Sequence, residues 1–561
     1  TGTRSKSLST DAATSRSSSY DYAVYKADGS ISTDNMNSTS SLSVGAGYTA
    51  VVTSSGANAF TVTIPVEFIY SVSENPALHK ATLSKGESYR FVNEGTQTRA
   101  VSADTSTAQD RKYDYANYNE DGSLSSSNFE STGKPYLGGG NEIIFTGAGS
   151  QPVTIGLPYE VYTGEWSDEP AYTRVTLNQG ESYQFTNISG KSDALQSDGS
   201  TKDKHDYVVY LPDGTESSTG TNTSTKPTVA AGRTAVVTLV TATPVTYGVP
   251  YRTFDVQKAG GDAITRVTVY PGESVIFRNN GSLANPIKNN ASSSNGAVFD
   301  YVLYTAEDVV HSDGFNKNTN PIIRSQGYAV VTVAGQVPIE FSYTDDFSVE
   351  DSMEPAYHRV TLNQGESVTF WNNSTDREYL DSDASTSQGR IFDYVTYYPD
   401  GTERSTRKAT AVEPVVFYGN KAVVTNVSAQ PVTIGAIYTI FDVEDRPNEA
   451  LSKITVSPGQ SVKFHNGGSL SNPIRSNAKS VGSLYDVVVY KANGRAHSDK
   501  FNNNGSLATI PAGGEAIVTV VGSTPVLFEY TDDFSVVDSQ EPAYLRVTLN
   551  QGESYAFTNT S

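Results

Sequence analysis

The stretch FDYVTYYPDG (residues 392–401) combines an alternating strand pattern with an Asp-Gly turn. A period of two places Asp393 and Tyr397 on one side of a β-sheet. The rings of Phe392 and Tyr394 then point to the other side. The Asp-Gly pair that follows is typical of a tight hairpin turn. The stretch therefore predicts a β-strand that leads directly into a second strand.

The same strand recurs along the chain at steps of 92–94 in the numbering, with its aspartate at Asp21, Asp114, Asp206, Asp300, Asp393 and Asp486. A second marker is the first glycine of a Gly-Glu-Ser or Gly-Gln-Ser turn, at Gly86, Gly180, Gly272, Gly365, Gly459 and Gly552. A third is a proline that opens an apolar run, at Pro65, Pro152, Pro244, Pro338, Pro431 and Pro525. Three markers in one order indicate six copies of one unit.

The sequence also repeats with a longer period that contains two of these units. The segment GSLANPIKNNA from Gly281 matches GSLSNPIRSNA from Gly468, which gives an offset of 187 in the numbering. Three such blocks equal the 561 residues of the chain. If Ser561 were joined to Thr1, the spacing from the turn glycine to the next strand aspartate would be 30, against 26–28 elsewhere. We therefore expect head-to-tail continuation, either within a longer polypeptide or between copies that complete each other's split unit.

The fold class that these patterns predict is all-β, a linear tandem array of about six immunoglobulin-like β-sandwich domains of about 93 residues, paired into blocks of 187. Acidic, proline-containing segments are the expected linkers, and the alternative boundary is the Ser/Asn-rich loop before each Asp-Tyr strand. The expected divisions are a partial sandwich at 1–75, five repeats at 76–169, 170–260, 261–354, 355–446 and 447–541, and a second partial sandwich at 542–561.

The composition narrows the possible functions. The net charge of −21 disfavours binding to nucleic acid or to an anionic membrane. The absence of cysteine excludes disulfides, thiolate metal sites and thiol nucleophiles. No window has the long apolar run of a membrane span. We expect a chain that is stabilised by packing alone.

Two polar features allow a structural and a metal-binding interpretation. The repeated aspartate is expected to accept backbone N–H bonds from the loop before its strand, with calcium binding as the alternative. The acidic joints offer oxygen ligands that could hold Ca²⁺ between domains, at Asp345, Asp346, Glu350, Asp351, Asp532 and Asp533. The Gly-Glu-Ser motif is interpreted as a turn, because Gln460 replaces the glutamate in one copy. No other cofactor is expected.

Catalysis and covalent crosslinking find little support in the sequence. His311 and His497 each precede Ser-Asp, but neighbours along a strand point to opposite faces and cannot form a triad. A self-formed isopeptide bond would require a repeated lysine, whereas the position of Lys80 and Lys453 holds arginine in the other copies. Asn-x-Ser/Thr sequons occur, for example at Asn187, Asn222, Asn290, Asn372 and Asn426, but the motif is weak. We expect no enzyme activity.

Tandem cysteine-free β-domains with an acidic, Ser/Thr/Asn/Tyr-rich surface resemble the repeat regions of bacterial surface adhesins and extracellular fibres. The resemblance implies an extracellular or cell-surface location and a structural role, with copies of the chain or its continuation as partners. The alternative is an adhesin stalk whose loops bind glycans or a host surface. The drift among the loops, with the strands held constant, favours the structural role.

Overall fold

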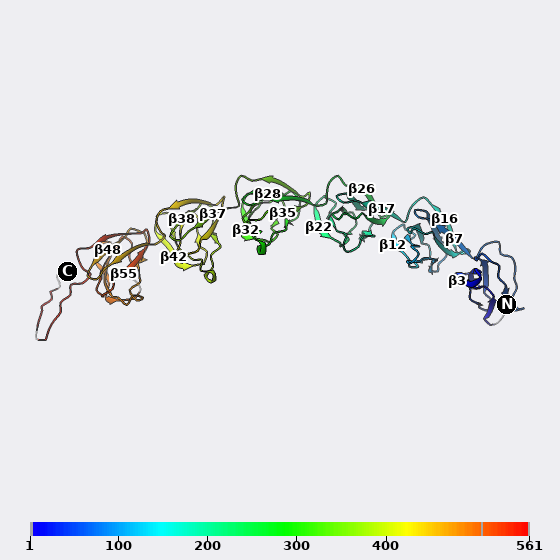
Figure 1. Cartoon of the computed structure of the whole chain (residues 1–561), viewed down its shortest axis with the longest axis horizontal. Helices are drawn as coiled ribbons and strands as arrows, with labels where there is room; N and C mark the ends of the chain where they lie inside the picture. Colours follow the sequence, from blue (N-terminus) through cyan, green and yellow to red (C-terminus); the bar gives the residue numbers. More distant parts are fainter. Residues whose placement is uncertain (1–3, 506–508, 552, 559–561) are drawn as a thin grey trace. The chain divides into compact units, whose positions relative to one another are not determined.

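The computed structural model describes residues 4–505, 509–551 and 553–558. In these residues the regular structure is almost entirely β-strand (Figure 1), and the helices are single 3-10 turns, η1 (Thr14–Arg16), η2 (Ser293–Asn295) and η3 (Thr386–Gln388). No helix in the described part is long and apolar enough to cross a membrane. The expected all-β fold with repeated domains is confirmed.

The second domain contains the repeated plan in full. Its strands are β7 (Leu78–Leu83), β8 (Ser88–Asn93), β9 (Arg99–Ala100), β10 (Ser102–Ala103), β11 (Tyr113–Tyr118), β12 (Leu124–Ser131), β13 (Tyr136–Leu137), β14 (Glu142–Gly147), β15 (Val153–Pro158) and β16 (Tyr162–Ser167). Five form one antiparallel sheet in the order β12-β11-β14-β8-β16, and three form a second in the order β10-β15-β7. Between them Phe91, Tyr113 and Phe145 pack with Leu83 and Ile155 in a shared core.

The third to sixth domains have the same sheets with the same strand order. The seven longer strands of the third domain are β17 (Tyr172–Leu177), β18 (Ser182–Asn187), β21 (His205–Tyr210), β22 (Glu216–Thr223), β24 (Thr234–Leu239), β25 (Val245–Pro250) and β26 (Phe254–Lys258). Those of the fourth are β27 (Thr265–Val269), β28 (Ser274–Asn279), β31 (Phe299–Tyr304), β32 (Val310–Lys317), β34 (Tyr328–Val333), β35 (Ile339–Tyr343) and β36 (Phe347–Asp351).

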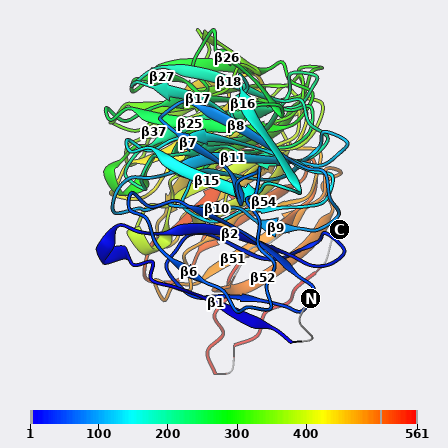
Figure 2. The same cartoon turned by 90° about the vertical axis from the view of Figure 1, so that its right-hand side faces the viewer.

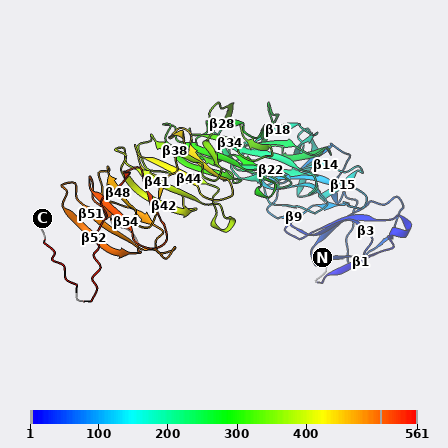
Figure 3. The ribbon, with the colours of Figure 1, turned by 60° about the vertical axis from the view of Figure 1, so that its left-hand side comes forward.

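Those of the fifth domain are β37 (Tyr357–Leu362), β38 (Ser367–Asn372), β41 (Phe392–Tyr397), β42 (Glu403–Thr410), β44 (Lys421–Asn426), β45 (Val432–Ile437) and β46 (Phe441–Arg446). Those of the sixth are β47 (Ser452–Val456), β48 (Ser461–Asn466), β51 (Tyr485–Tyr490), β52 (Ala496–Asn503), β54 (Glu515–Val520), β55 (Val526–Tyr530) and β56 (Phe534–Asp538). Figure 3 shows β51, β52 and β54 side by side in one sheet.

The first domain has fewer strands than the others. They are β1 (Lys6–Thr10), β2 (Tyr20–Tyr25), β3 (Ile31–Ser38), β4 (Leu42–Val44), β5 (Thr49–Ser54) and β6 (Val62–Thr63), several of which are labelled in Figure 2. They form the sheets β3-β2-β5 and β4-β1-β6. By their pairing, β2, β3 and β5 correspond to β11, β12 and β14. Among the described residues of this domain, no strand takes the place of β7 or β8.

In the first copy the proline marker is not equivalent to the proline marker of the second copy. The strand β6 pairs with β1 in the register in which β15 pairs with β10. This register aligns Pro65 with Pro158 at the end of β15, and not with Pro152 before its start. The sequence-based equivalence of Pro65 and Pro152 is therefore wrong. It misleads because an apolar run follows both prolines.

The chain divides into two compact units. One comprises Thr1–Arg266, Gly281–Asn285 and Ser342–Phe347, and the other comprises Val267–Asn280, Pro286–Phe341 and Ser348–Ser561. The division passes through the fourth domain, and the contacts described below each lie within one unit. The exact domain boundaries stay predictions.

Candidate functional site

The aspartate of the repeated strand is the most constant polar feature of the structure. In every copy it is the second residue of its strand and at most 5% exposed. Its Oδ1 accepts a backbone N–H at 2.7–2.9 Å from the residue sixteen positions later, which is Asn37, Glu130, Asn222, Asn316, Ala409 or Asn502. These donors have φ between +44° and +56°. The aspartate therefore holds a backbone irregularity in the following strand in place.

This finding corrects one expectation. The N–H bond comes from the strand after the aspartate, and not from the loop before it. The pairing of the two strands shifts register beside the aspartate, as between Phe392 and Tyr394. A β-bulge leaves a residue outside the regular ladder. The aspartate accepts the N–H that this irregularity would otherwise leave without a partner inside the protein.

In five copies the same carboxylate also binds a cation further along the chain, which lies on the first strand of the next domain or, for Asp486, in the C-terminal segment after the sixth domain. The cation is an arginine at four joints and a lysine at one, at N–O distances of 2.5–2.9 Å, in the pairs Asp114–Arg174, Asp206–Arg266, Asp300–Arg359, Asp486–Arg546 and Asp21–Lys80. A buried charge is tolerated when it is paired and hydrogen-bonded. The repeated aspartate thus joins a bulge in its own domain to the domain that follows.

The joint after the fifth domain departs from this rule. Lys453 stands at the cation position but contacts Glu449. Burial raises the pKa of Asp393, although the hydrogen bond from the Ala409 N–H and the positive charges of Lys408 and Lys453 act to lower it. Burial likewise raises the pKa of Asp300, where Arg359 acts in the opposite direction.

A second link is made by threonine hydroxyls. At each joint a threonine Oγ1 accepts the backbone N–H of the alanine that begins the next domain, at 2.6–2.8 Å, in the pairs Thr53–Ala77, Thr146–Ala171, Thr238–Ala263, Thr332–Ala356, Thr425–Ala450 and Thr519–Ala543. Many of these alanines are fully buried, as Ala450 is. The start of each domain is therefore anchored on the preceding sheet.

One kind of joint adds an aromatic ring, and we name it the arginine–phenylalanine joint. The guanidinium carbon lies 4.1–4.4 Å from the centre of a phenylalanine ring in the pairs Arg174–Phe129, Arg359–Phe315 and Arg546–Phe501. The ring also packs against Gly248 or Gly435 of the next domain, where an added Cβ would lie 2.2 or 2.4 Å from a ring atom. Cation–π attraction and close packing both require this combination of residues.

The other kind, which we name the acidic joint, uses polar contacts. Asp346 accepts the N–H of Glu216 at 2.8 Å, and Thr344 donates to the Glu216 side chain at 2.8 Å. Asp533 and Thr531 make the corresponding contacts with Glu403. The two sets of contacts are related by the longer period of the sequence. The contact chemistry therefore alternates over the joints from the second domain to the sixth.

The calcium candidates lie at these acidic joints, where other groups bind most of them. Asp346 also accepts a bond from Asn285 at 2.9 Å, and Asp533 accepts one from Asn472. Both aspartates are 6% exposed. Their hydrogen bonds place protein donors where an ion would have to bind.

The remaining candidates point to separate partners. Asp532 binds Arg446 at 2.7 Å, and Glu350 binds Arg278 at 3.1 Å. Burial and the neighbouring Asp346 raise the pKa of Asp345, and Asp351 is exposed. In the described ranges no three His, Cys, Asp or Glu side chains are grouped so that they could hold a metal ion. Calcium binding stays a prediction without a built site.

The turn glycines take the conformation that only glycine adopts easily. Gly86, Gly180, Gly272, Gly365 and Gly459 have φ of +77° to +87°. Gly552 lies outside the described residues. The next residue closes the turn by accepting a backbone N–H three positions earlier, and Gln460 does this at 3.0 Å just as Glu366 does at 2.7 Å. An amide serves as well as a carboxylate in this contact.

One titratable cluster was not expected from the sequence. The hydroxyl of Tyr357, which is 2% exposed, contacts Asp313 of the fourth domain and lies 2.9 Å from Asp381 of the fifth. Burial, and then the nearby Asp313 carboxylate, raise the pKa of Asp381. The Tyr357 hydroxyl and Asp381 therefore lie in a poorly solvated part of this joint, beside the exposed Asp313.

Three of the six histidines make buried or stacked contacts. His79 stacks on Tyr159 with ring centres 3.8 Å apart, and His358 stacks on Tyr438 at 4.3 Å. A ring nitrogen of His205 lies 3.0 Å from the Thr225 carbonyl. Burial lowers the pKa of all three.

The phenylalanines of the joints could have been found from the sequence. Phe129, Phe315 and Phe501 follow one another at equal steps. The glycine in VTYGVP and VTIGAI, which makes room for the ring, stands at Gly248 and Gly435. The period was visible, but which face each residue occupies depends on the bulge.

No family model matches this chain, and no curated protein matches it either.

Proposed function

We propose that this chain is a structural protein that forms an extracellular filament or surface fibre by head-to-tail continuation of β-sandwich domains. The observation that carries this proposal is the repeated joint. Each domain contacts the next through a buried carboxylate, a hydrogen bond from an alanine N–H to a threonine hydroxyl, and packed side chains. A chain of independent modules joined by flexible linkers needs none of these contacts.

The connections themselves are short. Four residues separate the end of β16 at Ser167 from the start of β17 at Tyr172. One of them, Ala171, is fully buried and hydrogen-bonded to Thr146. Short connections anchored on both sides favour transmission of force along the chain over independent motion of the domains.

The surface charge supports a role outside the cell. A net charge of −21 in 561 residues keeps neighbouring chains apart and soluble. Packing without cysteine makes the fold independent of the redox state of its surroundings. These properties fit a filament exposed to solvent along its length.

Electron microscopy of the purified chain at increasing concentration tests the proposal. We expect unbranched fibres one domain wide that lengthen with concentration. Dispersed particles at every concentration would contradict the fibre. Saturable binding to a glycan array by such dispersed particles would instead favour the adhesin alternative.

A further inference from the structure

The fifth domain of this acidic chain has a basic strand. In β42 the side chains of Arg404, Arg407 and Lys408 are exposed. The corresponding strands of the second and third domains, β12 and β22, contain no lysine or arginine, and those of the fourth and sixth, β32 and β52, contain one lysine each. On a chain with a net charge of −21, a positive strand is a local site of attraction for negative charge.

The strand β42 lies at an edge of its sheet. The strand order is β42-β41-β44-β38-β46. The pairing of β42 with β41 shifts register twice, between Phe392 and Tyr394 and between Thr396 and Tyr397. Bulges at an edge disfavour the addition of another strand by main-chain hydrogen bonds. The side chains of β42 are therefore the groups that this edge offers to a partner.

Aromatic rings hold the Arg404 side chain in place. Its guanidinium carbon lies 3.6 Å from the centre of the Phe417 ring and 5.1 Å from that of the Tyr398 ring. Stacking on a ring leaves the N–H groups at the edge of the guanidinium plane able to bind a carboxylate with two hydrogen bonds. Among the described residues no carboxylate lies within ion-pair distance of Arg404. The side chain is therefore positioned for a carboxylate that its own chain does not supply.

Arg407 is likewise without a carboxylate in the described part of the chain. It pairs across the sheet with Tyr394. Burial raises the pKa of Tyr394, and the charge of Arg407 acts to lower it. The positive charge of Arg407 therefore adds to that of Arg404 along the same edge.

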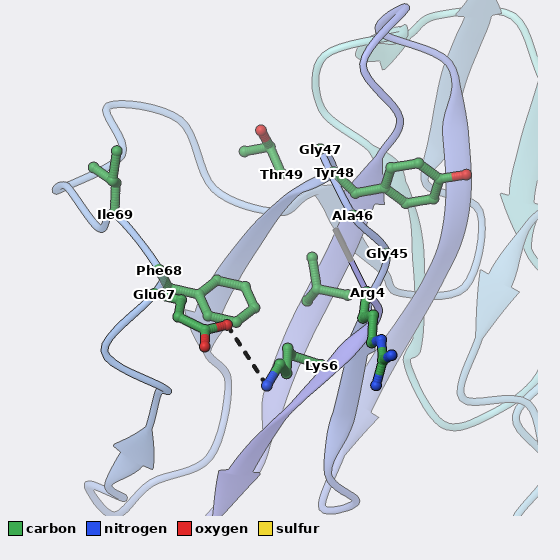
Figure 4. Close-up of a pocket in the computed structure, with 11 residues that line it drawn as sticks. Arg4, Lys6, Gly45, Ala46, Gly47, Tyr48, Thr49, Glu67, Phe68 and Ile69 are labelled. Carbon is green, nitrogen blue, oxygen red and sulfur yellow. Dashed lines mark ion pairs between the residues drawn. The ribbon is translucent and has the colours of Figure 1, made fainter. Parts of the chain in front are cut away.

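Many other basic side chains have a carboxylate of the same chain beside them. At a hollow in the first domain, Lys6 lies 3.5 Å from Glu67 (Figure 4). In β42 itself, Lys408 contacts Glu529. Arg404 and Arg407 are therefore the charges of β42 that are open to a partner.

The opposite edge of the same sheet is acidic. Asp442, Glu444 and Asp445 of β46 are exposed, and in the described residues no lysine or arginine lies within ion-pair distance of them. Neighbouring residues of a strand point to opposite faces, so Glu444 and Asp445 present carboxylates on both sides of this edge. The corresponding strands β16, β26, β36 and β56 contain one or two acidic residues each. The most basic and the most acidic of these edges thus belong to one sheet.

Charged side chains at a sheet edge commonly keep copies of a protein apart. Charges of one sign at both edges achieve this, because every edge then repels every other edge. In the fifth domain the two edges have opposite signs, so an edge of one copy attracts the other edge of a second copy. The arrangement therefore favours association over separation.

We propose that β42 of one copy of this chain binds β46 of a second copy. Arg404 and Arg407 supply the positive charges of this contact. Glu444 and Asp445 of the second copy supply the carboxylates. The two edges are different surfaces, so each copy keeps one edge free and the contact can continue from copy to copy. It joins chains laterally and does not depend on the proposed head-to-tail filament.

Paired charge reversals test this contact. Arg404→Glu with Arg407→Glu makes both edges acidic, and Glu444→Lys with Asp445→Lys makes both edges basic. Sedimentation velocity at about 0.1 M salt, where charges more than about 10 Å apart are largely screened, should show roughly tenfold weaker self-association for each variant alone. An equal mixture of the two variants should associate as the parent does, because acidic edges again meet basic edges. Salt at about 1 M should abolish the association of the parent.

A matched control separates the edges from the net charge. Arg377→Glu with Arg495→Glu changes exposed arginines outside β42 and gives the same net charge as the first variant. This control should associate as the parent does. Net charge alone predicts instead that the acidic variant associates less and the basic variant more. Unchanged denaturant midpoints establish that every variant is folded.

Three outcomes would overturn the lateral contact. They are parental self-association of both reversed variants, a mixture of folded variants that stays dissociated, and a parent that binds dextran sulfate through β42 but does not associate with itself. Electron microscopy separates this result from the filament. Single fibres without lateral contacts at about 0.1 M salt would leave the filament and overturn the contact, whereas laterally associated chains without fibres would do the reverse.

Discussion

Two neighbouring joints surround equivalent aspartates with different side chains. One joins the fourth and fifth domains, and the other joins the fifth and sixth. At the first, Asp300 binds Arg359, which covers the ring of Phe315. At the second, Lys453 forms an ion pair with Glu449 and not with Asp393. There Asp533 accepts the backbone N–H of Glu403. The buried aspartate and its bulge are constant, whereas the groups that bridge to the next domain vary. The aspartate is therefore part of the domain. The cation and the acidic contacts can secure a joint separately, as at these two joints, or together, as where Asp206–Arg266 accompanies the contact of Asp346 with Glu216.

The largest effect should come from removing the ring. Phe315 lies in one apolar cluster with Tyr357 and the core of the fifth domain. Phe315→Ala should lower the free energy of unfolding of the fifth domain by about 3 kcal/mol, because it leaves a cavity at the joint. Denaturant unfolding followed by Trp371 fluorescence, with Trp166→Phe to silence the other tryptophan, measures this. Lys408→Ala, at the matching position of the next joint, should change it by about 0.5 kcal/mol.

Removing the arginine should have the next largest effect. Arg359→Ala leaves Asp300 buried with its bond to Asn316 but without its cation. We expect a loss of about 2 kcal/mol in the same fluorescence measurement. Arg377→Ala, at an exposed arginine of the same domain, is the control and should be neutral. Equal effects of the two changes would contradict the role of the joint.

The Tyr357 cluster should make this joint sensitive to pH. The folded pKa of Asp381 is raised above its ordinary value of 3.8, so the folded state keeps a proton that the unfolded state releases. Stability from this group should therefore rise as the pH falls from neutrality towards 4. We expect a gain of about 1 kcal/mol for the fifth domain relative to Asp381→Asn, which cannot titrate. Parallel pH profiles of the two proteins would show that the cluster does not titrate in this way.

We expect the smallest effect from a change at the joint between the fifth and sixth domains. Lys453→Arg gives this joint the longer, forked cation that the other joints use. If the guanidinium reaches Asp393, the fifth domain should gain about 0.5 kcal/mol, read again from Trp371. A loss would mean that the contact of Lys453 with Glu449 matters more than a bond to Asp393.

The period of the strands was sufficient to predict the sheets but not the joints. Alternation in FDYVTY correctly separates Phe392 and Tyr394, which lie in the core, from Val395 and Tyr397, which pack with Ala450 and Leu451 at the next joint. The partner of the aspartate could not be predicted, because its donor sits at a bulge sixteen residues later, and a bulge reverses the faces that alternation assigns. The asparagine at the end of the second strand was visible in every copy, but the role of one such residue, Asn93, depends on the nearby carbonyl of Gln97 and on those of Leu137 and Gly138, which lie 44 and 45 positions away.

If these joints are rigid, neighbouring domains are held in one orientation. Nitroxide labels at Gln336→Cys in the fourth domain and Thr375→Cys in the fifth are both at exposed positions of a chain without other cysteines. Pulsed electron–electron double resonance then measures the distribution of the distance between them. We expect one narrow distribution that broadens when Phe315→Ala and Arg359→Ala are combined. A broad distribution in the parent protein, unchanged by these substitutions, would contradict it.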